Sequence, residues 1–220
     1  MRRTRRASRR LLGLTRGEFA VLRRLRTPRK IQKFLYGLKQ NFELRGETCN
    51  SVRTVLRQRR AHCIEGALLA AAALWVHGEP PLLMDMQAVR DFDHVICLFR
   101  RNGRWGAISK TNGIGLRGRD PVYRTLRELA MSYVHEYTNK GGYKSLRTYS
   151  MPLDLRRLEP SEWATSEDAW DLVDHLESLR HFDLMGKKQL RTLVRHDPFE
   201  RMGGALVQYR RPKRRPKKKK

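Results

Sequence analysis

Residues 60–74 are RAHCIEGALLAAAAL, a run that predicts a buried helix beginning beside a cysteine. The residues that follow Cys63 are mostly small and aliphatic, which is typical of a helix enclosed on all sides. A thiol in the first turn of a helix faces unpaired backbone N–H groups and the positive end of the helix dipole. This setting lowers the pKa of a thiol and favours the nucleophilic thiolate. Cys63 is therefore a candidate nucleophile.

His94 is the candidate partner of this cysteine. It lies 31 positions after Cys63, an interval that accommodates a helix, a connection and one strand. Attack by a thiolate on a carbonyl needs an imidazole neighbour and a third group that orients the ring. Taken alone, the cysteine fits a small hydrophobic residue of the core and the histidine a structural one. Together with the helix, the pair favours catalysis.

The flanking sequence predicts helices before this run and a small antiparallel sheet after it. Strand-like runs occupy residues 82–89 and 93–101, and Asn102–Gly103 is a typical hairpin turn before a return strand at 105–109. Asp120–Pro121 is predicted to begin an amphipathic helix. Helices, then a small sheet, then further helices indicate an α+β fold. The earlier helices are expected at residues 28–38 and 48–60.

Three motifs in this order resemble the transglutaminase-like superfamily of papain-like folds, over about residues 48–112: CIEGA at 63–67, DHV at 93–95 and NGRW at 102–105. The resemblance implies a cysteine at the start of a core helix, a histidine on the next strand and an aspartate one strand later. It also implies that this helix packs on a small antiparallel sheet, with further helices on either side in the sequence. The implied chemistry is that of a thiol hydrolase: acyl transfer or hydrolysis of a peptide or protein amide through a thioester.

One position departs from the family pattern. Ser109 stands fifteen residues after His94, where the family has its aspartate. A serine hydroxyl accepts a hydrogen bond from an imidazole N–H but carries no charge to stabilise an imidazolium. Asn112 is the alternative, because papain-type enzymes orient the ring with an asparagine. Asp93 adjoins the histidine on a strand and is expected to point to the opposite face.

Other side chains near the cysteine are expected to have no catalytic role. His62 is adjacent to Cys63, and neighbours on a helix diverge by about 100°. Glu65 lies two positions further on and is expected to face away from the sulfur. The backbone N–H of Cys63 is the expected oxyanion donor, with Gln58 as an alternative.

The formal charge of +26 is concentrated at the two ends of the chain. Residues 1–30 carry a net +11 and residues 210–220 hold nine Lys and Arg without an acid, which leaves +6 for residues 31–209. We expect three parts: a basic N-terminal extension at 1–27, a transglutaminase-like α+β domain at 28–209, and a disordered basic tail after it. The Arg-rich start also resembles a mitochondrial transit peptide.

These basic ends favour a second hypothesis, of a different class. The fold would be kept with a degenerate site, for which Ser109 in place of an aspartate is the indication. The termini would then bind nucleic acid, an acidic partner or an anionic membrane surface by charge.

The remaining features narrow the class of protein. The three cysteines, Cys49, Cys63 and Cys97, form no CxxC spacing, which indicates reduced thiols and a cytoplasmic location. The histidines form no metal-binding motif, so we expect neither a metal nor another cofactor. No segment reaches 18 apolar residues, so we expect no membrane span.

Overall fold

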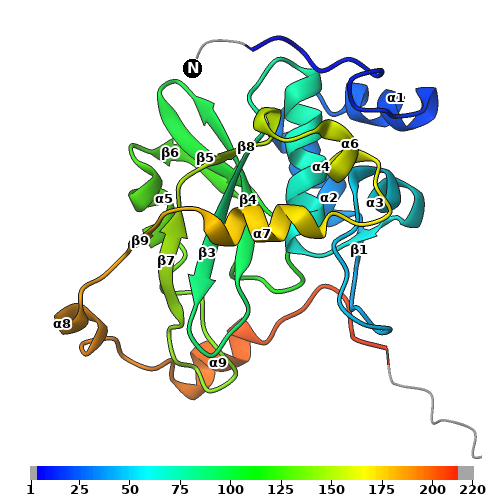
Figure 1. Ribbon diagram of the computed structural model, residues 1–220. Coiled ribbons are helices and arrows are strands. Elements are labelled where there is room, and N and C mark those ends of the chain that lie inside the picture. The colour runs from blue at the N-terminus through cyan, green and yellow to red at the C-terminus, as the bar shows by residue number, and fades with distance from the viewer. Residues whose placement is uncertain (1–3, 213–220) are drawn as a thin grey trace, which may run out of the picture.

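The computed structural model describes residues 4–212, and its centre is an antiparallel sheet with helices packed against it (Figure 1). Seven strands form this sheet: β3 (Leu82–Ala88), β4 (His94–Arg101), β5 (Arg104–Ile108), β6 (Arg119–Tyr123), β7 (Leu146–Ser150), β8 (Leu153–Asp154) and β9 (His181–Asp183). The strand order is β6-β5-β4-β3-β7-β9, and β8 pairs with β3 off this path. The predicted hairpin turn between β4 and β5 is confirmed, since Asn102 and Gly103 have φ of 49° and 77°.

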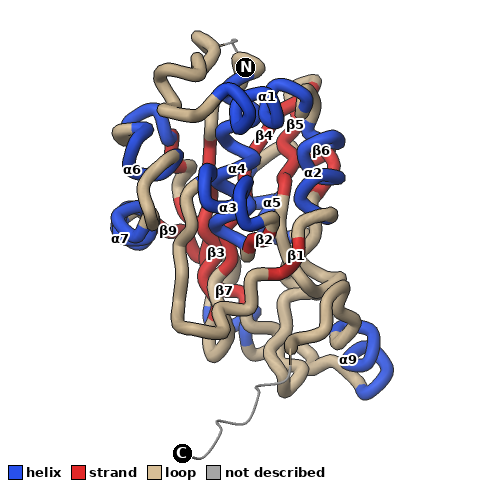
Figure 2. Tube along the Cα trace, turned by 90° about the vertical axis from the view of Figure 1, so that its right-hand side faces the viewer, coloured by secondary structure: helices blue, strands red, loops and turns tan. Residues whose placement is uncertain are grey.

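The helices before and after the sheet agree with the expected α+β class (Figure 2). Two short strands, β1 (Lys39–Gln40) and β2 (Arg60–Ala61), pair in parallel beside them. The helical segments are α1 (Arg16–Arg24), α2 (Pro28–Tyr36), α3 (Val52–Gln58), α4 (Cys63–Val76), α5 (Leu126–Met131), the 3₁₀ turn Leu155–Arg157, α6 (Pro160–Ala164), α7 (Trp170–Ser178), α8 (Lys187–Leu190) and α9 (Pro198–Gly204).

The sheet separates two hydrophobic cores because strand side chains alternate between its faces. Along β4, Val95 and Cys97 join the core formed with α4, whereas Ile96 and Leu98 join the core formed with α5. Helices α1, α2, α3, α6 and α7 also contribute to the first core. The histidine at the start of β4 therefore lies where the sheet meets the beginning of the central helix.

The central helix α4 is enclosed, as its sequence predicts. Every residue from Ile64 to Val76 is buried. Its run of alanines allows close approach to β4, and at its far end Trp75 stacks on Trp163 of α6 with ring centroids 6.3 Å apart. Burial on all sides fixes the helix, and with it the position of its first residue, Cys63.

The segment expected as a basic extension, of which the structure describes residues 4–27, contributes to this same core. Leu12, Leu14 and Leu22 are buried and belong to the cluster around α4. The indole of Trp75 donates to the carbonyl of Arg5 at 3.1 Å, which ties the segment to the end of the helix. The expected boundary at residue 27 is therefore not a boundary of the hydrophobic core.

The prediction that a helix begins at Asp120–Pro121 is wrong. Residues 119–123 instead form β6, which pairs with β5 at the edge of the sheet. An edge strand accommodates Pro121 because one side of its backbone needs no ladder donor. The helix begins only at Leu126, after Thr125 caps it by accepting from the Glu128 N–H at 3.1 Å.

Within residues 4–212, none of the helices combines the length and apolar character that crossing a bilayer requires. Most of the predicted basic tail, residues 213–220, lies outside the described residues.

Candidate active site

The site is built around the first turn of α4. Cys63 is the first residue of this helix, as predicted, and His62 is the N-cap in an extended conformation (φ −104°, ψ −164°). The backbone N–H of His62 donates to the Glu65 carboxylate at 2.8 Å, the reciprocal arm of a capping box. Cys63 as a residue is only partly buried, in contrast to the enclosed residues Ile64–Val76 that follow it.

His94 approaches this thiol from the sheet. It is the first residue of β4, is 4% exposed, and pairs in register with Met86 of β3. Its Nε2 lies 2.8 Å from the Ser109 hydroxyl, which itself donates to the carbonyl of Leu116 at 2.5 Å. Because the serine proton is used on that carbonyl, Ser109 accepts from Nε2–H. This leaves Nδ1 of His94 as the nitrogen that can accept a proton.

Ser109 is held in place from helix α2. The Gln32 side chain accepts from the Ser109 N–H at 2.9 Å and donates to the Ser109 carbonyl at 2.7 Å. Gly118 gives room for this clamp, since a Cβ there would lie 2.3 Å from Oε1 of Gln32. The serine that orients His94 is thus fixed on both sides of its backbone.

Asn112, the predicted alternative to Ser109, does not reach the imidazole. Its side-chain amide donates to the carbonyl of Tyr209 and accepts from the Tyr209 N–H, both at 2.9 Å. The NH₂ and the C=O of this side chain are therefore both bound to the C-terminal segment. The prediction that Asn112 orients His94 is wrong, and Asn112 instead anchors that segment.

The three thiols differ in acidity. Burial raises the pKa of Cys63, but the imidazoles of His62 and His94 outweigh burial and hold it well below its ordinary value. Burial raises the pKa of Cys49 to about 12 and that of Cys97 well above its ordinary value. Only the thiol at the start of α4 therefore has the character of a reactive nucleophile.

His62 contacts the sulfur, contrary to the expectation that it diverges from Cys63. Its Nδ1 lies 3.9 Å from the Cys63 Sγ, and its Nε2 lies 2.8 Å from the carbonyl of Thr48 and 3.3 Å from Glu65 Oε1. The expectation was wrong because the N-cap has extended backbone, so the 100° rotation between helical neighbours does not apply. Burial lowers the pKa of His62, but Cys63 and Glu65 raise it to about 11.

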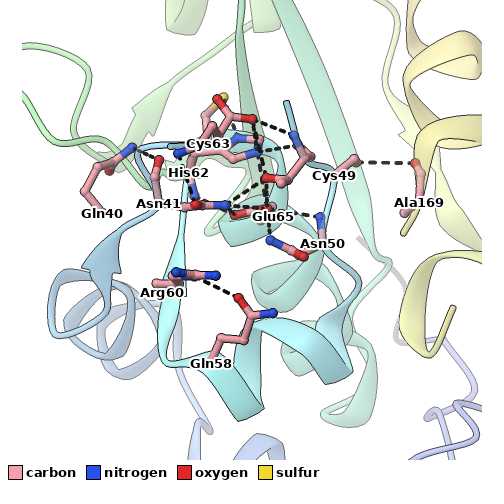
Figure 3. A network of polar contacts seen from close by, with 12 residues as sticks. Gln40, Asn41, Cys49, Asn50, Gln58, Arg60, His62, Cys63, Glu65 and Ala169 are labelled. Carbon is pink, nitrogen blue, oxygen red and sulfur yellow. Dashed lines mark hydrogen bonds and ion pairs between the residues drawn. The ribbon is translucent and has the colours of Figure 1, made fainter. Parts of the chain in front are cut away.

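Glu65 makes no hydrogen bond to the sulfur, but it belongs to the site through its contacts with His62. Its carboxylate is completely buried and accepts from Nδ2 of Asn41, the Thr48 hydroxyl, the N–H and side-chain amide of Asn50, and the N–H of His62 (Figure 3). Burial raises the pKa of Glu65, but His62 and the backbone donors outweigh it and lower the pKa below its ordinary value. The cluster keeps a carboxylate anionic in the protein interior.

Two further candidates lie outside this cluster. Gln58 accepts from Nε of Arg60 at 2.7 Å, and Figure 3 shows both side chains apart from the thiol, so Gln58 is not an oxyanion donor. Asp93 accepts from the N–H of Ala88 at 2.8 Å and so closes the β3–β4 turn, consistent with its expected orientation away from the ring of His94.

The sequence contained a signal for part of the missed cluster. His62 and Glu65 have the spacing of a capping box, in which the third residue of the helix reaches back to the N-cap. Asn41, Thr48 and Asn50 belong to an irregular segment before α3, and no pattern indicated that they surround a carboxylate. Across residues 4–212, no group of three or more His, Cys, Asp or Glu side chains is arranged to hold a metal ion.

Comparisons with known proteins add no assignment: no family model matches the chain, and no curated protein matches it.

Proposed function

We propose that the chain is a transglutaminase-like enzyme with a papain-like fold, and that it performs cysteine-dependent acyl transfer or amide hydrolysis at Cys63. One observation carries this proposal: His94, fixed by Ser109 at 2.8 Å, is also one of the imidazoles that lower the pKa of the Cys63 thiol. The order of a cysteine on a helix, a histidine on the next strand of the antiparallel sheet and its orienting residue after the following strand supports the family resemblance.

The geometry supports a thioester mechanism. The Cys63 thiolate attacks a carbonyl carbon, and the resulting oxyanion faces the backbone N–H groups at the start of α4. His94 in its imidazolium form donates a proton from Nδ1 to the leaving amine, while Ser109 holds the other nitrogen. Water or an amine then attacks the thioester and gives a proton back to His94. A peptide or protein amide is the proposed substrate.

A chemical trap tests the nucleophile directly. After incubation with p-nitrophenyl acetate and an acid quench, peptide mass spectrometry should find the acetyl group on Cys63. Iodoacetamide at pH 6 should alkylate Cys63 far faster than Cys49 and Cys97, which serve as internal controls because burial raises their pKa values. Equal, slow alkylation of all three thiols, with no acetyl adduct, would contradict the proposal.

A second candidate function is a binding module that retains the fold without turnover. It is favoured by the nine Lys and Arg among residues 210–220 and by the uncharged Ser109. Affinity for a generic DNA duplex should survive Cys63→Ala, fall when residues 210–220 are deleted, and decrease steeply with salt. No duplex binding by the full chain would rule this function out.

A further inference from the structure

Two imidazoles flank Cys63, and they are supported differently. The ring of His94 is held by Ser109, a neutral hydroxyl. The ring of His62 is held by Glu65, a buried carboxylate, at 3.3 Å. A carboxylate behind an imidazole both orients the ring and stabilises its protonated form, whereas a hydroxyl only orients it. The charge that Ser109 lacks is therefore supplied by Glu65 through His62.

The hydrogen-bond chemistry fixes how the protons on His62 are arranged. Its Nε2 faces only acceptors, the carbonyl of Thr48 at 2.8 Å and carboxylate oxygens of Glu65 and Glu43 at 3.3 and 3.6 Å. Nε2 must therefore carry a proton, since two facing acceptors without one would repel. Nδ1 then faces the Cys63 Sγ at 3.9 Å, and a proton between them lies on either the sulfur or the ring.

The surroundings of this pair decide where that proton resides. Glu65 accepts from five donor groups, which belong to Asn41, Thr48, Asn50 and His62, and each of them favours the ionised carboxylate. A fixed negative charge 3.3 Å from Nε2 favours a positive ring. The other titratable groups near the thiol, Cys49 and Tyr137, remain neutral because burial raises the pKa of both.

We propose that His62, oriented and charged by Glu65, is the resting counter-ion of the Cys63 thiolate, which leaves His94 to carry out proton transfer. This inference rests on the proposed cysteine chemistry and divides between two histidines the work that a single histidine does in a Cys–His–Asp site. Glu65 is a positioning residue, because it contacts the imidazole and not the reacting sulfur.

The division balances protons through the cycle. In the resting enzyme the thiol proton resides on Nδ1 of His62, and the thiolate and that ring keep their ion pair until attack. As the C–N bond breaks, the imidazolium of His94 gives its proton to the leaving amine, and the acyl group remains on Cys63 as a thioester. Attacking water then gives its OH to the acyl carbon and its proton to His94. The C–S bond breaks, and the thiolate returns to its ion pair.

The test is the pH dependence of alkylation at Cys63 in the full chain. Iodoacetamide rates for this residue are measured from pH 4 to 10 in wild type, His62→Gln, His94→Gln and the control His77→Gln. His77 lies at the opposite end of α4, where its Nε2 contacts the carbonyl of Leu22 at 3.2 Å. In His62→Gln we expect the midpoint to rise by at least one pH unit, so that the rate at pH 6 falls about tenfold or more.

His62→Gln and His94→Gln should differ in the step that they impair. His94→Gln should shift the midpoint less than His62→Gln does, yet abolish release of acetate from the acetylated enzyme. A His62→Gln midpoint at the wild-type value, with wild-type alkylation fast at pH 6, would overturn this inference and leave the proposed function standing. Slow alkylation of Cys63 in wild type at pH 6 would contradict both this inference and the proposed function.

A measurement on the wild-type protein covers the case in which His62→Gln does not fold. Long-range ¹H–¹⁵N spectra of the histidine rings at pH 9 should show a doubly protonated imidazole at His62, because the pKa of His62 is raised to about 11 by Cys63 and Glu65 against the effect of burial. Alkylation of Cys63 should shift its resonances, since Sγ lies 3.9 Å from Nδ1. Seven neutral histidines at pH 9 would overturn the inference.

Discussion

Replacing Glu65 with glutamine should destabilise the protein strongly, although it removes a single charge and conserves shape. The carboxylate is completely buried and accepts from five donors, those of Asn41, Thr48, Asn50 and His62. A glutamine offers one oxygen, and its amide nitrogen would face donors in place of acceptors. Even with its oxygen in the place of Oε1, the two donors to Oε2, the N–H of His62 and Nδ2 of Asn41, would face the new amide nitrogen, at about 1–3 kcal/mol each.

The expected loss is therefore about 2–6 kcal/mol, against the roughly 5–15 kcal/mol that usually separates folded from unfolded domains. Urea unfolding at pH 7, followed by tryptophan fluorescence, measures the loss in the free energy of unfolding. Trp75 and Trp163 lie at the far end of α4 and report on the core.

A matched control is Glu200→Gln. Glu200 makes the same capping-box contact in α9, where its carboxylate accepts from the N–H of Asp197 at 2.9 Å, but it is exposed. Its replacement should cost no more than about 1 kcal/mol. If Glu65→Gln costs no more than this control, the buried donors do not depend on the carboxylate, and the reasoning is refuted.

Four other substitutions have expected outcomes. Gly66→Ala should lose about 1–3 kcal/mol in thermal denaturation, because the new Cβ would lie 2.4 Å from Cβ of Lys110. Gly17→Ala should gain up to about 1 kcal/mol in stability, because nothing lies within 4 Å of the added Cβ. Equal changes in stability for the two glycine variants would contradict this reasoning. Burial lowers the pKa of Lys110 from its ordinary value of 10.5 to about 8. Between these two pH values the folded state therefore binds fewer protons than the unfolded state. Relative to Lys110→Met, wild type should therefore gain up to about 3 kcal/mol in urea unfolding as pH rises from 8 to 10.5, and parallel curves would disprove it. Burial raises the pKa of Asp85 to about 6 despite its contact with His181, so the folded state holds the extra proton between the ordinary value of 3.8 and 6. Wild type should thus lose about 3 kcal/mol relative to Asp85→Asn between pH 4 and 6, whereas a gain would reverse the sign of the argument.

The sequence located the features of the site that depend on spacing along single elements. An apolar run predicted the central helix with Cys63 at its start, and the hairpin signal placed His94 and Ser109 on neighbouring parts of one sheet. Their contact at 2.8 Å follows from antiparallel pairing, which brings the start of one strand beside the end of the next.

The features that sequence reasoning missed depend on long-range contacts or on backbone at the end of an element. Asn112 is engaged by Tyr209, 97 positions away, and local spacing contains no information about that contact. Asp120–Pro121 also fits a helix start, so local sequence predicts a helix where pairing with β5 instead produces strand β6. The predicted divergence of His62 from Cys63 assumes helical backbone at His62, whereas the helix begins one residue later, at Cys63.

The leucines at positions 12, 14 and 22 also bear on where the chain can be shortened. Starting the polypeptide at residue 28 would strip all three from the side of α4 and remove the carbonyl of Arg5 that accepts from Trp75. The uncovered helix would then expose apolar surface to water at its far end, inviting aggregation even with the cysteine intact. Loss of activity in such a truncated protein would therefore reflect a damaged hydrophobic core and not the role of Cys63. Activity should be measured on protein that retains the arginine-rich N-terminal residues.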